Sequence, residues 1–467
     1  MSLLGRFSTP HIHGSGAQPR ATTDAPEQPV AVPVEPPGLI ELGQQRRMLD
    51  AKVRLHRKLI DEINLQAIEK VGEADLRRKV QELVTQYVLD ERLPLNGSEL
   101  EQLVDELVDE MTGLGPLEPL LKDPSINDIL INTHERVYVE RAGILERVPV
   151  FFKDEQHLLR IVNKIVSAVG RRVDELQPMV DARLADGSRV NVAVRPVAVD
   201  GPLVSIRKFS KQVFSLDRLV GIGSLTQPMA ELLAAAVNCR LSMLVSGGTG
   251  SGKTTLLNAL SQHIAHQERL ITIEDAAELQ LQQPHVGRLE TRPPTIEAKG
   301  EIRQRELVRN ALRMRPDRII IGEVRGEEAF DMLQAMNTGH EGSLTTIHAN
   351  TARDALTRLE QMIGMAGMPM SQQSVRSQIA SAIRVVIQLN RLSDGSRRVT
   401  QVAEITGMEG EVIQMQPIFE FVRLGTDASG AVRGEMRATG LRPKFLDVLR
   451  LSGREMPADM FEPRRSA

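Results

Sequence analysis

The stretch Gly247-Gly248-Thr249-Gly250-Ser251-Gly252-Lys253-Thr254 decides the fold of this 467-residue chain. An apolar run over residues 241–246 leads into it, and the residues from Thr255 to Ile264 have the pattern of a helix. This is the motif G-x-x-x-x-G-K-T between a strand and a helix, which is the setting that a phosphate-binding loop requires. Its glycines let successive backbone N–H groups point at a polyphosphate near a helix N-terminus. We therefore predict that the residues from Gly247 to Thr255 hold the phosphates of a nucleotide.

Two side chains at the end of this motif have separate predicted roles. Lys253 supplies a positive charge to the β- and γ-phosphate oxygens, and the hydroxyl group of Thr254 suits a ligand of Mg²⁺. The pattern therefore predicts that a nucleoside triphosphate binds together with Mg²⁺.

Acidic residues end two apolar strands further along the chain. The first strand, 270–273, is followed by Glu274, Asp275 and Glu278, and the second, 319–321, by Gly322 and Glu323. Ligands of open α/β sheets bind at the carboxyl ends of the strands, where these acids are expected. The second strand resembles a Walker B strand in which Gly322 stands at the usual Asp position. Hydrolysis needs a group that orients or deprotonates water, so Glu274 and Glu323 are both candidates.

A third strand ending in polar residues spans 339–350 and contains His348. We interpret His348 as a sensor of the γ-phosphate, with a purely structural role as the alternative. Arg305, Arg309 and Arg313 recur at every fourth position, which predicts that they share one helix face. That face is either exposed to solvent or in contact with the nucleotide of a neighbouring subunit.

The rest of the sequence divides into regions of different pattern. Helical periodicity before residue 112 predicts three helices, with Ser98 and Glu101 as the capping box of the third and Gly113 at its end. Short strands then surround a helix at 157–168, and after residue 216 strands and helices alternate, as in a parallel sheet, before an antiparallel appendage. The predicted regions are a disordered proline-rich tail (1–40), a helical bundle (41–112), an α+β domain (113–210), a linker (211–215), an α/β domain (216–455) and a C-terminal tail (456–467).

Composition excludes several classes of protein. The formal net charge is −3, from 58 basic and 61 acidic residues, so no overall basic field indicates binding to nucleic acid. The single cysteine, Cys239, excludes an intramolecular disulfide framework and a four-cysteine zinc site. No run approaches the ~20 apolar residues that cross a bilayer, and the first residues lack a secretory signal pattern. We therefore expect a cytoplasmic location.

The ordered blocks 247–255, 273–278, 319–326 and 339–350 together resemble the type II/type IV secretion ATPase superfamily. They are similar to its Walker A, Asp box, Walker B and His box, and Gly322-Glu323 is similar to that family's own pattern. Three stretches before them, 112–120, 126–132 and 181–190, resemble the CpaF-type ATPases of tight-adherence (Flp) pilus assembly. The segments 313–317 and 441–446 agree with that branch. The resemblance covers residues 42–455.

This resemblance implies an α/β fold in which a C-terminal RecA-like P-loop NTPase domain follows an α+β domain and a small N-terminal helical bundle. It implies a homo-hexameric ring that binds ATP and Mg²⁺ between the two larger domains of each subunit. By the same resemblance Glu274 activates water and Glu323 holds the hydration shell of Mg²⁺, although the reverse assignment stays open. Arg195 and Arg207 are implied as phosphate contacts, with Arg183 and Arg189 behind them. A solvent-exposed hairpin face is the alternative for these arginines.

The implied function is ATP hydrolysis at the cytoplasmic face of the inner membrane, coupled to pilus assembly or protein secretion. The implied partners are other copies of the chain, a platform protein of the inner membrane and, indirectly, pilin subunits. One alternative is a nucleic-acid-translocating or conjugation ATPase, although we expect no nucleic acid. Another is a scaffold that binds ATP without hydrolysing it.

Overall fold

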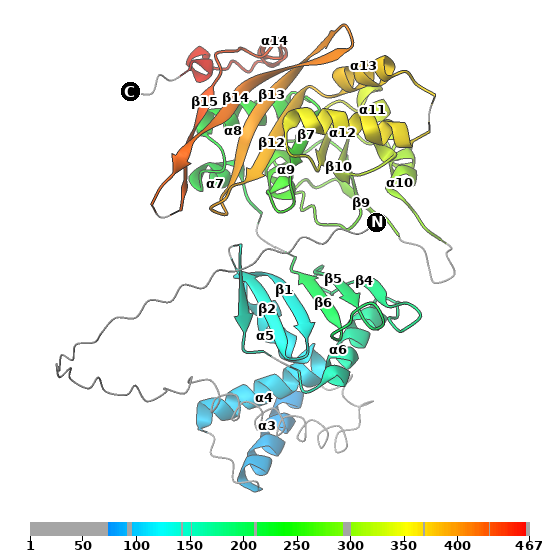
Figure 1. Ribbon diagram of the computed structural model, residues 1–467, viewed down its shortest axis with the longest axis vertical. Coiled ribbons are helices and arrows are strands. Elements are labelled where there is room, and N and C mark those ends of the chain that lie inside the picture. The colour runs from blue at the N-terminus through cyan, green and yellow to red at the C-terminus, as the bar shows by residue number, and fades with distance from the viewer. Residues whose placement is uncertain are drawn as a thin grey trace, which may run out of the picture. The chain divides into compact units, whose positions relative to one another are not determined.

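A computed structural model describes residues 73–90, 96–141, 143–150, 152–209, 213–292, 300–367, 369–428 and 430–463. The predicted proline-rich tail and the first predicted helix lie outside these residues. The second and third predicted helices are confirmed as α3 (Glu73–Asp90) and α4 (Gly97–Thr112) (Figure 1). Both helices bury apolar side chains at four-residue spacing, Leu76 and Val80 on α3 and Leu103 and Leu107 on α4.

The N-terminus of α4 differs from the prediction by two residues. The predicted capping box of Ser98 and Glu101 is wrong, because Asn96 is the N-cap. The Asn96 side chain accepts a hydrogen bond from the Glu99 N–H at 2.9 Å, and the Glu99 carboxylate accepts one from the Asn96 N–H at 2.8 Å. Asn caps a helix as well as Ser does, and the earlier start adds two residues to the helix. The predicted end at Gly113 is confirmed.

A six-stranded antiparallel sheet follows, in the order β3-β2-β1-β6-β5-β4. The 3-10 turn η1 (Gly115–Leu117) and the short helix α5 (Glu118–Lys122) precede it. The amphipathic helix α6 packs its apolar residues into the core of the sheet, as the pattern of residues 157–168 predicts. The strands are β1 (Ile126–Thr133), β2 (Arg136–Arg141), β3 (Ile144–Val148), β4 (Met179–Arg183), β5 (Arg189–Ala193) and β6 (Leu203–Arg207), and α6 spans Glu155–Ala168.

Four charged side chains form a row across one face of this sheet. Arg183 on β4 is paired with Arg189 on β5, Arg189 with Arg207 on β6, and Arg207 with Asp128 on β1. Directly paired residues of neighbouring strands point to the same face of a sheet. The predicted hairpin around residues 185–188 is therefore confirmed, and it presents its arginines on one side.

A nine-stranded sheet forms the rest of the structure, in the order β15-β14-β13-β12-β7-β11-β10-β8-β9. The part from β12 to β9 is parallel, and β13 to β15 extend it as antiparallel strands (Figure 1). The predicted α/β class is confirmed. The strands are β7 (Met243–Gly247), β8 (Leu270–Glu274), β9 (Val286–Glu290), β10 (Arg318–Val324), β11 (Leu344–Ile347), β12 (Val385–Arg391), β13 (Arg397–Glu409), β14 (Val412–Thr426) and β15 (Val432–Ala438).

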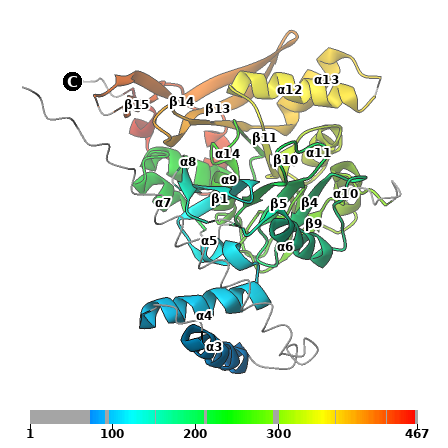
Figure 2. The same cartoon turned by 60° about the horizontal axis from the view of Figure 1, so that its bottom comes forward.

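Helices bury both faces of the parallel strands. Met243 and Val245 of β7 belong to one core cluster, with α7, α8, α9 and α14, whereas Leu244 belongs to another, with α10 to α13. Burial on both faces explains why the central strands are almost continuously apolar. Figure 2 shows α12 and α13 side by side next to β13. The helices are α7 (Leu216–Gly221), α8 (Gln227–Asn238), α9 (Lys253–Ser261), α10 (Gln304–Ala311), α11 (Glu328–Asn337), α12 (Ala352–Met365), α13 (Gln372–Ala382), α14 (Leu446–Leu451) and η2 (Ala458–Phe461).

The predicted arginine face is only partly present. Helix α10 ends at Ala311, so Arg313 lies beyond it and does not continue the face. Arg305 and Arg309 both bond to Asp331 on α11. Of the helices that the structure describes, none is sufficiently long and apolar to pass through a membrane.

Candidate active site

The phosphate loop connects β7 to α9, as the motif predicts. Gly250 and Gly252 have φ angles of +68° and +98°, a region that glycine occupies without steric cost. Gly252 is also the N-cap of α9, and it has no side chain with which to cap the helix. A Cβ atom on Gly247 would lie 2.6 Å from the Leu389 carbonyl oxygen, so only glycine fits there. The loop therefore presents backbone N–H groups at an uncapped helix N-terminus, which suits an anion.

Lys253 folds back over this loop. Its Nζ donates to the carbonyl oxygens of Gly247 and Gly248, at 3.0 Å each. Burial lowers the pKa of Lys253, although the Glu323 carboxylate acts in the opposite direction. The ammonium group thus already lies beside the loop and is partly removed from water, where an added phosphate charge interacts with it strongly.

Glu274, the last residue of β8, is only 3% exposed. Its Oε2 accepts hydrogen bonds from the backbone N–H groups of Glu278 and Leu279, at 2.7 and 2.8 Å. Its Oε1 is buried and has no hydrogen-bond partner within the described part of the chain. Burial raises the pKa of Glu274 to about 7. One carboxylate oxygen is thus fixed, while the other is free to bind a proton or a water molecule.

Gly322 on β10 leaves the space that Glu274 occupies. A Cβ atom on Gly322 would lie 2.9 Å from Glu274 Cγ, so the Asp usual in a Walker B strand would collide with Glu274. The Gly322 carbonyl accepts a hydrogen bond from Thr346 Oγ1 on β11 at 2.6 Å. The exchange of Asp for Gly therefore has a steric cause in the neighbouring strand.

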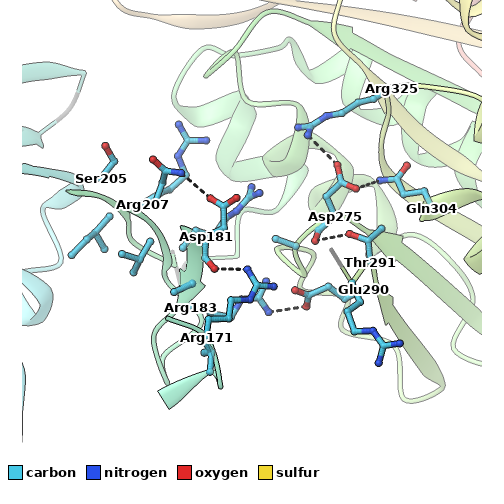
Figure 3. Close-up of a pocket in the computed structure, with 18 of the residues that line it drawn as sticks. Arg171, Asp181, Arg183, Ser205, Arg207, Asp275, Glu290, Thr291, Gln304 and Arg325 are labelled. Atoms are coloured by element: carbon cyan, nitrogen blue, oxygen red, sulfur yellow. Dashed lines mark hydrogen bonds and ion pairs between the residues drawn. The ribbon is translucent and has the colours of Figure 1, made fainter. Parts of the chain in front are cut away.

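Glu323 is held by an arginine two residues later in the chain. Arg325 Nε and Nη2 donate to Glu323 Oε2 at 3.0 and 2.6 Å, and Arg325 Nη1 donates to Asp275 Oδ2 at 3.0 Å. Asp275 Oδ1 in turn accepts from the Gln304 side-chain amide at 3.0 Å. Figure 3 shows Arg325, Asp275 and Gln304 in this chain of contacts. Glu323 is therefore fixed through Oε2 by a positive charge.

A cleft of about 760 Å³ brings most of the predicted site residues together. Its walls include the loop from Thr249 to Thr255, Glu274, Glu323, His348 and Arg207. Gly247 and Gly248 precede the loop residues that line it. A larger cavity of about 1320 Å³ adjoins the cleft and shares Arg207 with it, but the phosphate loop does not line this cavity (Figure 3).

The predicted arginines are placed unequally. Arg207 and Arg189 line the cleft, whereas Arg195 is not among its lining residues and instead has its Nε 3.5 Å from Glu155 Oε1. Arg189 bonds to Glu278 at 2.8 Å. Arg183 bonds to Glu290 at 2.9 Å, as Figure 3 shows. Of the two arginines that the resemblance implied as phosphate contacts, Arg207 lines the cleft and Arg195 does not, and Arg189, implied behind them, lines it as well.

Other cationic residues of the cleft were not among the predicted site residues. They are Arg325, Arg391, Arg397, Arg358 and Lys208. Arg325 stands two residues after Glu323, so its position in the sequence was a usable signal. Arg391 and Arg397 come from the paired strands β12 and β13, and their approach to the loop depends on the order of strands in the sheet.

The residues present fit a nucleotide with Mg²⁺. The N–H groups at the uncapped N-terminus of α9 suit the phosphates, and the ammonium group of Lys253 lies beside them. The Thr254 hydroxyl and the Glu323 carboxylate line the same cleft and supply the oxygen ligands that Mg²⁺ prefers. Mg²⁺ held by these two residues would neutralise charge on the phosphates.

The family model described as "Type II/IV secretion system protein" matches residues 110–432. A Mycobacterium tuberculosis protein, provisionally named for conjugal transfer, is 38% identical over 335 residues, which are 70% of this chain and 94% of that protein. The conjugal transfer protein TrbB of Rhizobium radiobacter is 33% identical over 299 residues, 63% of this chain and 88% of that one. The crystal structure of the VirB11 ATPase of Brucella suis aligns with 30% identity, 62% and 96% coverage and a TM-score of 0.34. The match to the family model covers more than half of the sequence, and the chain belongs to the type II/IV secretion system protein family.

Proposed function

We propose that this protein hydrolyses ATP and uses the energy to drive a secretion or pilus-assembly machine. The observation that carries this proposal is the pairing of the phosphate loop with Glu274 in one cleft. A loop alone binds a nucleotide, whereas hydrolysis also needs a group that orients water or takes up its proton. Glu274 lies in the same cleft, and no described residue bonds to its Oε1.

We assign the role of general base to Glu274 rather than to Glu323. Its pKa of about 7 is close to the optimum for proton transfer near neutral pH. Its Oε2 is fixed by two backbone N–H groups, which leaves Oε1 to receive the proton of the attacking water. Glu323 Oε2 is already bonded to Arg325, and Glu323 lines the cleft with Thr254. These contacts favour Glu323 as the residue that holds the hydration shell of Mg²⁺.

The arginines of the six-stranded sheet have a proposed role in stabilising the transferred phosphoryl group. Arg207 and Arg189 line the cleft, and a guanidinium group stabilises the charge that develops on that group. Arg189 would then exchange its present partner Glu278 for phosphate oxygens when the two domains close. His348 lines the same cleft and is proposed to detect the γ-phosphate.

The finer function that we propose is assembly of Flp (tight-adherence) pili. In that role a homo-hexameric ring acts at the cytoplasmic face of the inner membrane, on a platform protein and through it on pilin subunits. The support is the similarity of residues 112–120, 126–132 and 181–190 to CpaF-type ATPases. A second candidate is conjugal transfer, which is favoured by the names of the Mycobacterium and Rhizobium relatives.

Phosphate release from MgATP by the purified protein tests the enzymatic proposal. We expect Lys253→Ala and Glu274→Gln to lower the turnover at least ~100-fold, because each removes a group that acts on the reacting phosphate or water. Glu231→Gln is the matched control, since Glu231 on α8 bonds to Gln227 and does not line the cleft. Turnover in Glu274→Gln equal to that of the control would overturn the assignment of the base.

The two cellular roles are separated by introducing Lys253→Ala at the native gene of the source organism. Loss of surface pili with unchanged plasmid transfer supports pilus assembly. Loss of transfer with unchanged pili supports conjugation instead. Steep, salt-sensitive stimulation of the ATPase by DNA would also favour the second role.

A further inference from the structure

The carboxyl end of β12 lies directly beside the phosphate loop. Strand β12 runs parallel to β7, and Leu389 is paired with Gly247, the first residue of the motif. The side-chain amide of Gln388 donates to the carbonyl oxygens of Ala349 and Asn350 at 3.3 and 3.0 Å. The end of β12 therefore touches both the phosphate loop and the segment that follows His348.

Arg391, the last residue of β12, extends from this position to the six-stranded sheet. Its Nη2 donates to the carbonyl oxygen of Gly143, in the turn between β2 and β3, at 3.1 Å. Its Nη1 lies 3.9 Å from the point where a Cβ atom of Gly250 would be. The two terminal nitrogens of one guanidinium group thus face two different parts of the chain, the turn and the phosphate loop.

Gly143 has the backbone that this contact needs. Its φ angle is +89°, and a Cβ atom there would lie 2.5 Å from Arg391 Nη2. The Gly143 N–H also donates to Glu140 Oε1, which closes the turn on β2. Because this hydrogen bond holds the turn against β2, a group that binds the Gly143 carbonyl also positions β2.

A second arginine reinforces the charge at this point. Arg397 on β13 is the cross-strand partner of Arg391, and its Cδ lies 3.9 Å from the point where a Cβ atom of Gly252 would be. Both arginines line the cleft that contains the phosphate loop. The end of the β12–β13 pair thus adds two positive charges beside the phosphate loop, and neither arginine has another role in the proposed function.

We propose that Arg391 is a positioning residue that bridges the bound nucleotide to the turn between β2 and β3. This inference rests on the proposed ATP-binding function. A polyphosphate in the loop brings negative charge to the Nη1 side, and hydrogen bonds to a charged oxygen are stronger than those to a carbonyl. The planar fork lets Nη1 hold a phosphate oxygen while Nη2 keeps the Gly143 carbonyl. Nucleotide binding then orders the turn and draws the six-stranded sheet to the loop.

Hydrogen exchange of residues 136–148, measured with and without saturating MgADP, tests the bridge, and calorimetry gives the affinity for MgADP. In the wild-type protein we expect MgADP to slow exchange in this segment. Arg391→Ala should weaken binding about 10-fold and abolish the slowing even at saturation. Arg391→Lys keeps the charge but lacks the fork, so it should bind better than Arg391→Ala and still lose the slowing. Gly143→Ala should also lose it, because the added methyl group displaces the guanidinium.

Arg423→Ala is the matched control, because Arg423 on β14 bonds to Ser393 and Thr426 and does not line the cleft. Arg423→Ala should have the same affinity for MgADP as the wild-type protein and the same slowing of hydrogen exchange in residues 136–148. Slowing that persists in saturated Arg391→Ala would overturn the bridge and leave the ATPase proposal intact. A wild-type protein that binds MgADP no better than Lys253→Ala would instead remove the proposed function on which the bridge depends.

Discussion

Buried charged side chains at the two ends of the nine-stranded sheet differ in their hydrogen bonding. At the amino end of β10, Arg318 is fully buried, and its Nε and Nη2 donate to the two carboxylate oxygens of Glu268 at 2.7 Å each. Its Nη1 donates to the Val237 and Gly342 carbonyl oxygens at 2.7 and 3.2 Å. This planar pairing uses the geometry that favours arginine over lysine.

At the carboxyl end, buried polar atoms are left without partners. Across the residues that the structure describes, Glu274 Oε1, Gln304 Oε1 and Gln388 Oε1 have none, and all three side chains are at least 94% buried. An unsatisfied buried group costs free energy, so native proteins rarely keep one without a use. Arg318 and Glu268 thus maintain the architecture at the amino end, whereas Glu274, beside the phosphate loop, keeps one oxygen without a partner in the described part of the chain.

The largest expected effect on stability is at the amino end of the sheet, where Arg318 and Glu268 are hydrogen-bonded to each other. Arg318→Ala should lower the free energy of unfolding by about 3 kcal/mol, because the buried Glu268 carboxylate loses two hydrogen bonds and keeps the half-exposed Arg240 at 3.2 Å. Urea unfolding followed by circular dichroism measures the loss. The double variant Arg318→Met with Glu268→Leu is the control, and it should recover most of the stability, since apolar residues need no partner. A loss below ~1 kcal/mol in Arg318→Ala would contradict the comparison.

A substitution of Glu274 is expected to raise the stability, whereas Arg318→Ala lowers it. The pKa of Glu274, about 7, lies above its ordinary value of 4.5. Since the folded state holds the proton more tightly, the contribution of this group to stability is complete below pH 4.5 and is lost as the pH rises through 7. At pH 8, Glu274→Gln should therefore be more stable than the wild-type protein by about 2 kcal/mol, after the cost of a buried amide N–H group.

Unfolding curves of both proteins at pH 5 and pH 8 test this sign. The advantage of Glu274→Gln should be much smaller at pH 5, where the wild-type carboxyl group is protonated. Turnover of the wild-type protein should fall as the pH drops below 7, because the base is then no longer ionised. An advantage that is equal at the two pH values would mean that the ionisation of Glu274 does not cause it.

A smaller effect is expected from Gly322→Ala at the same end of the sheet. The added methyl group would lie 2.9 Å from Glu274 Cγ, so Glu274 must move. We expect turnover to fall about 10-fold while stability falls by only about 1–2 kcal/mol. Gly364→Ala within α12 is the control, because no atom of the described residues lies within 4 Å of the methyl group that it adds. Equal turnover in the two variants would show that the position of Glu274 is not critical.

Much of this fold was predictable because its signals are local. The phosphate loop is a contiguous motif between a strand and a helix, and β7, β8, β10 and β11 are apolar runs that end in polar residues. The contacts made by Arg325 and Arg391 belong to a different class. Arg391 reaches Gly143 only because β12 lies beside β7, and no local pattern encodes that neighbour.

Two residues lie where the local sequence pattern does not predict them, and each has a physical cause. Arg313 fits the spacing of a helix face, yet α10 ends at Ala311, because spacing does not fix where a helix stops. Arg195 belongs to the segment that resembles the family, but its nearest carboxylate is that of Glu155 on α6. Its partner lies forty residues earlier in the chain, so no local pattern predicts this contact.

The smallest expected effect concerns the N-termini of two helices. One of them has a side-chain cap and the other has none. Helix α4 is capped by Asn96 and Glu99, whereas α9 has Gly252 as its N-cap and no side-chain cap. Asn96→Ala should therefore lower the thermal stability of the helical region by about 1 kcal/mol, while Ser98→Ala, at the predicted cap, should change it by less than ~0.5 kcal/mol. Circular dichroism melting of the full chain, with hydrogen exchange of residues 97–112, measures both. A larger loss in Ser98→Ala would restore the capping box predicted from sequence and would place the start of α4 two residues later.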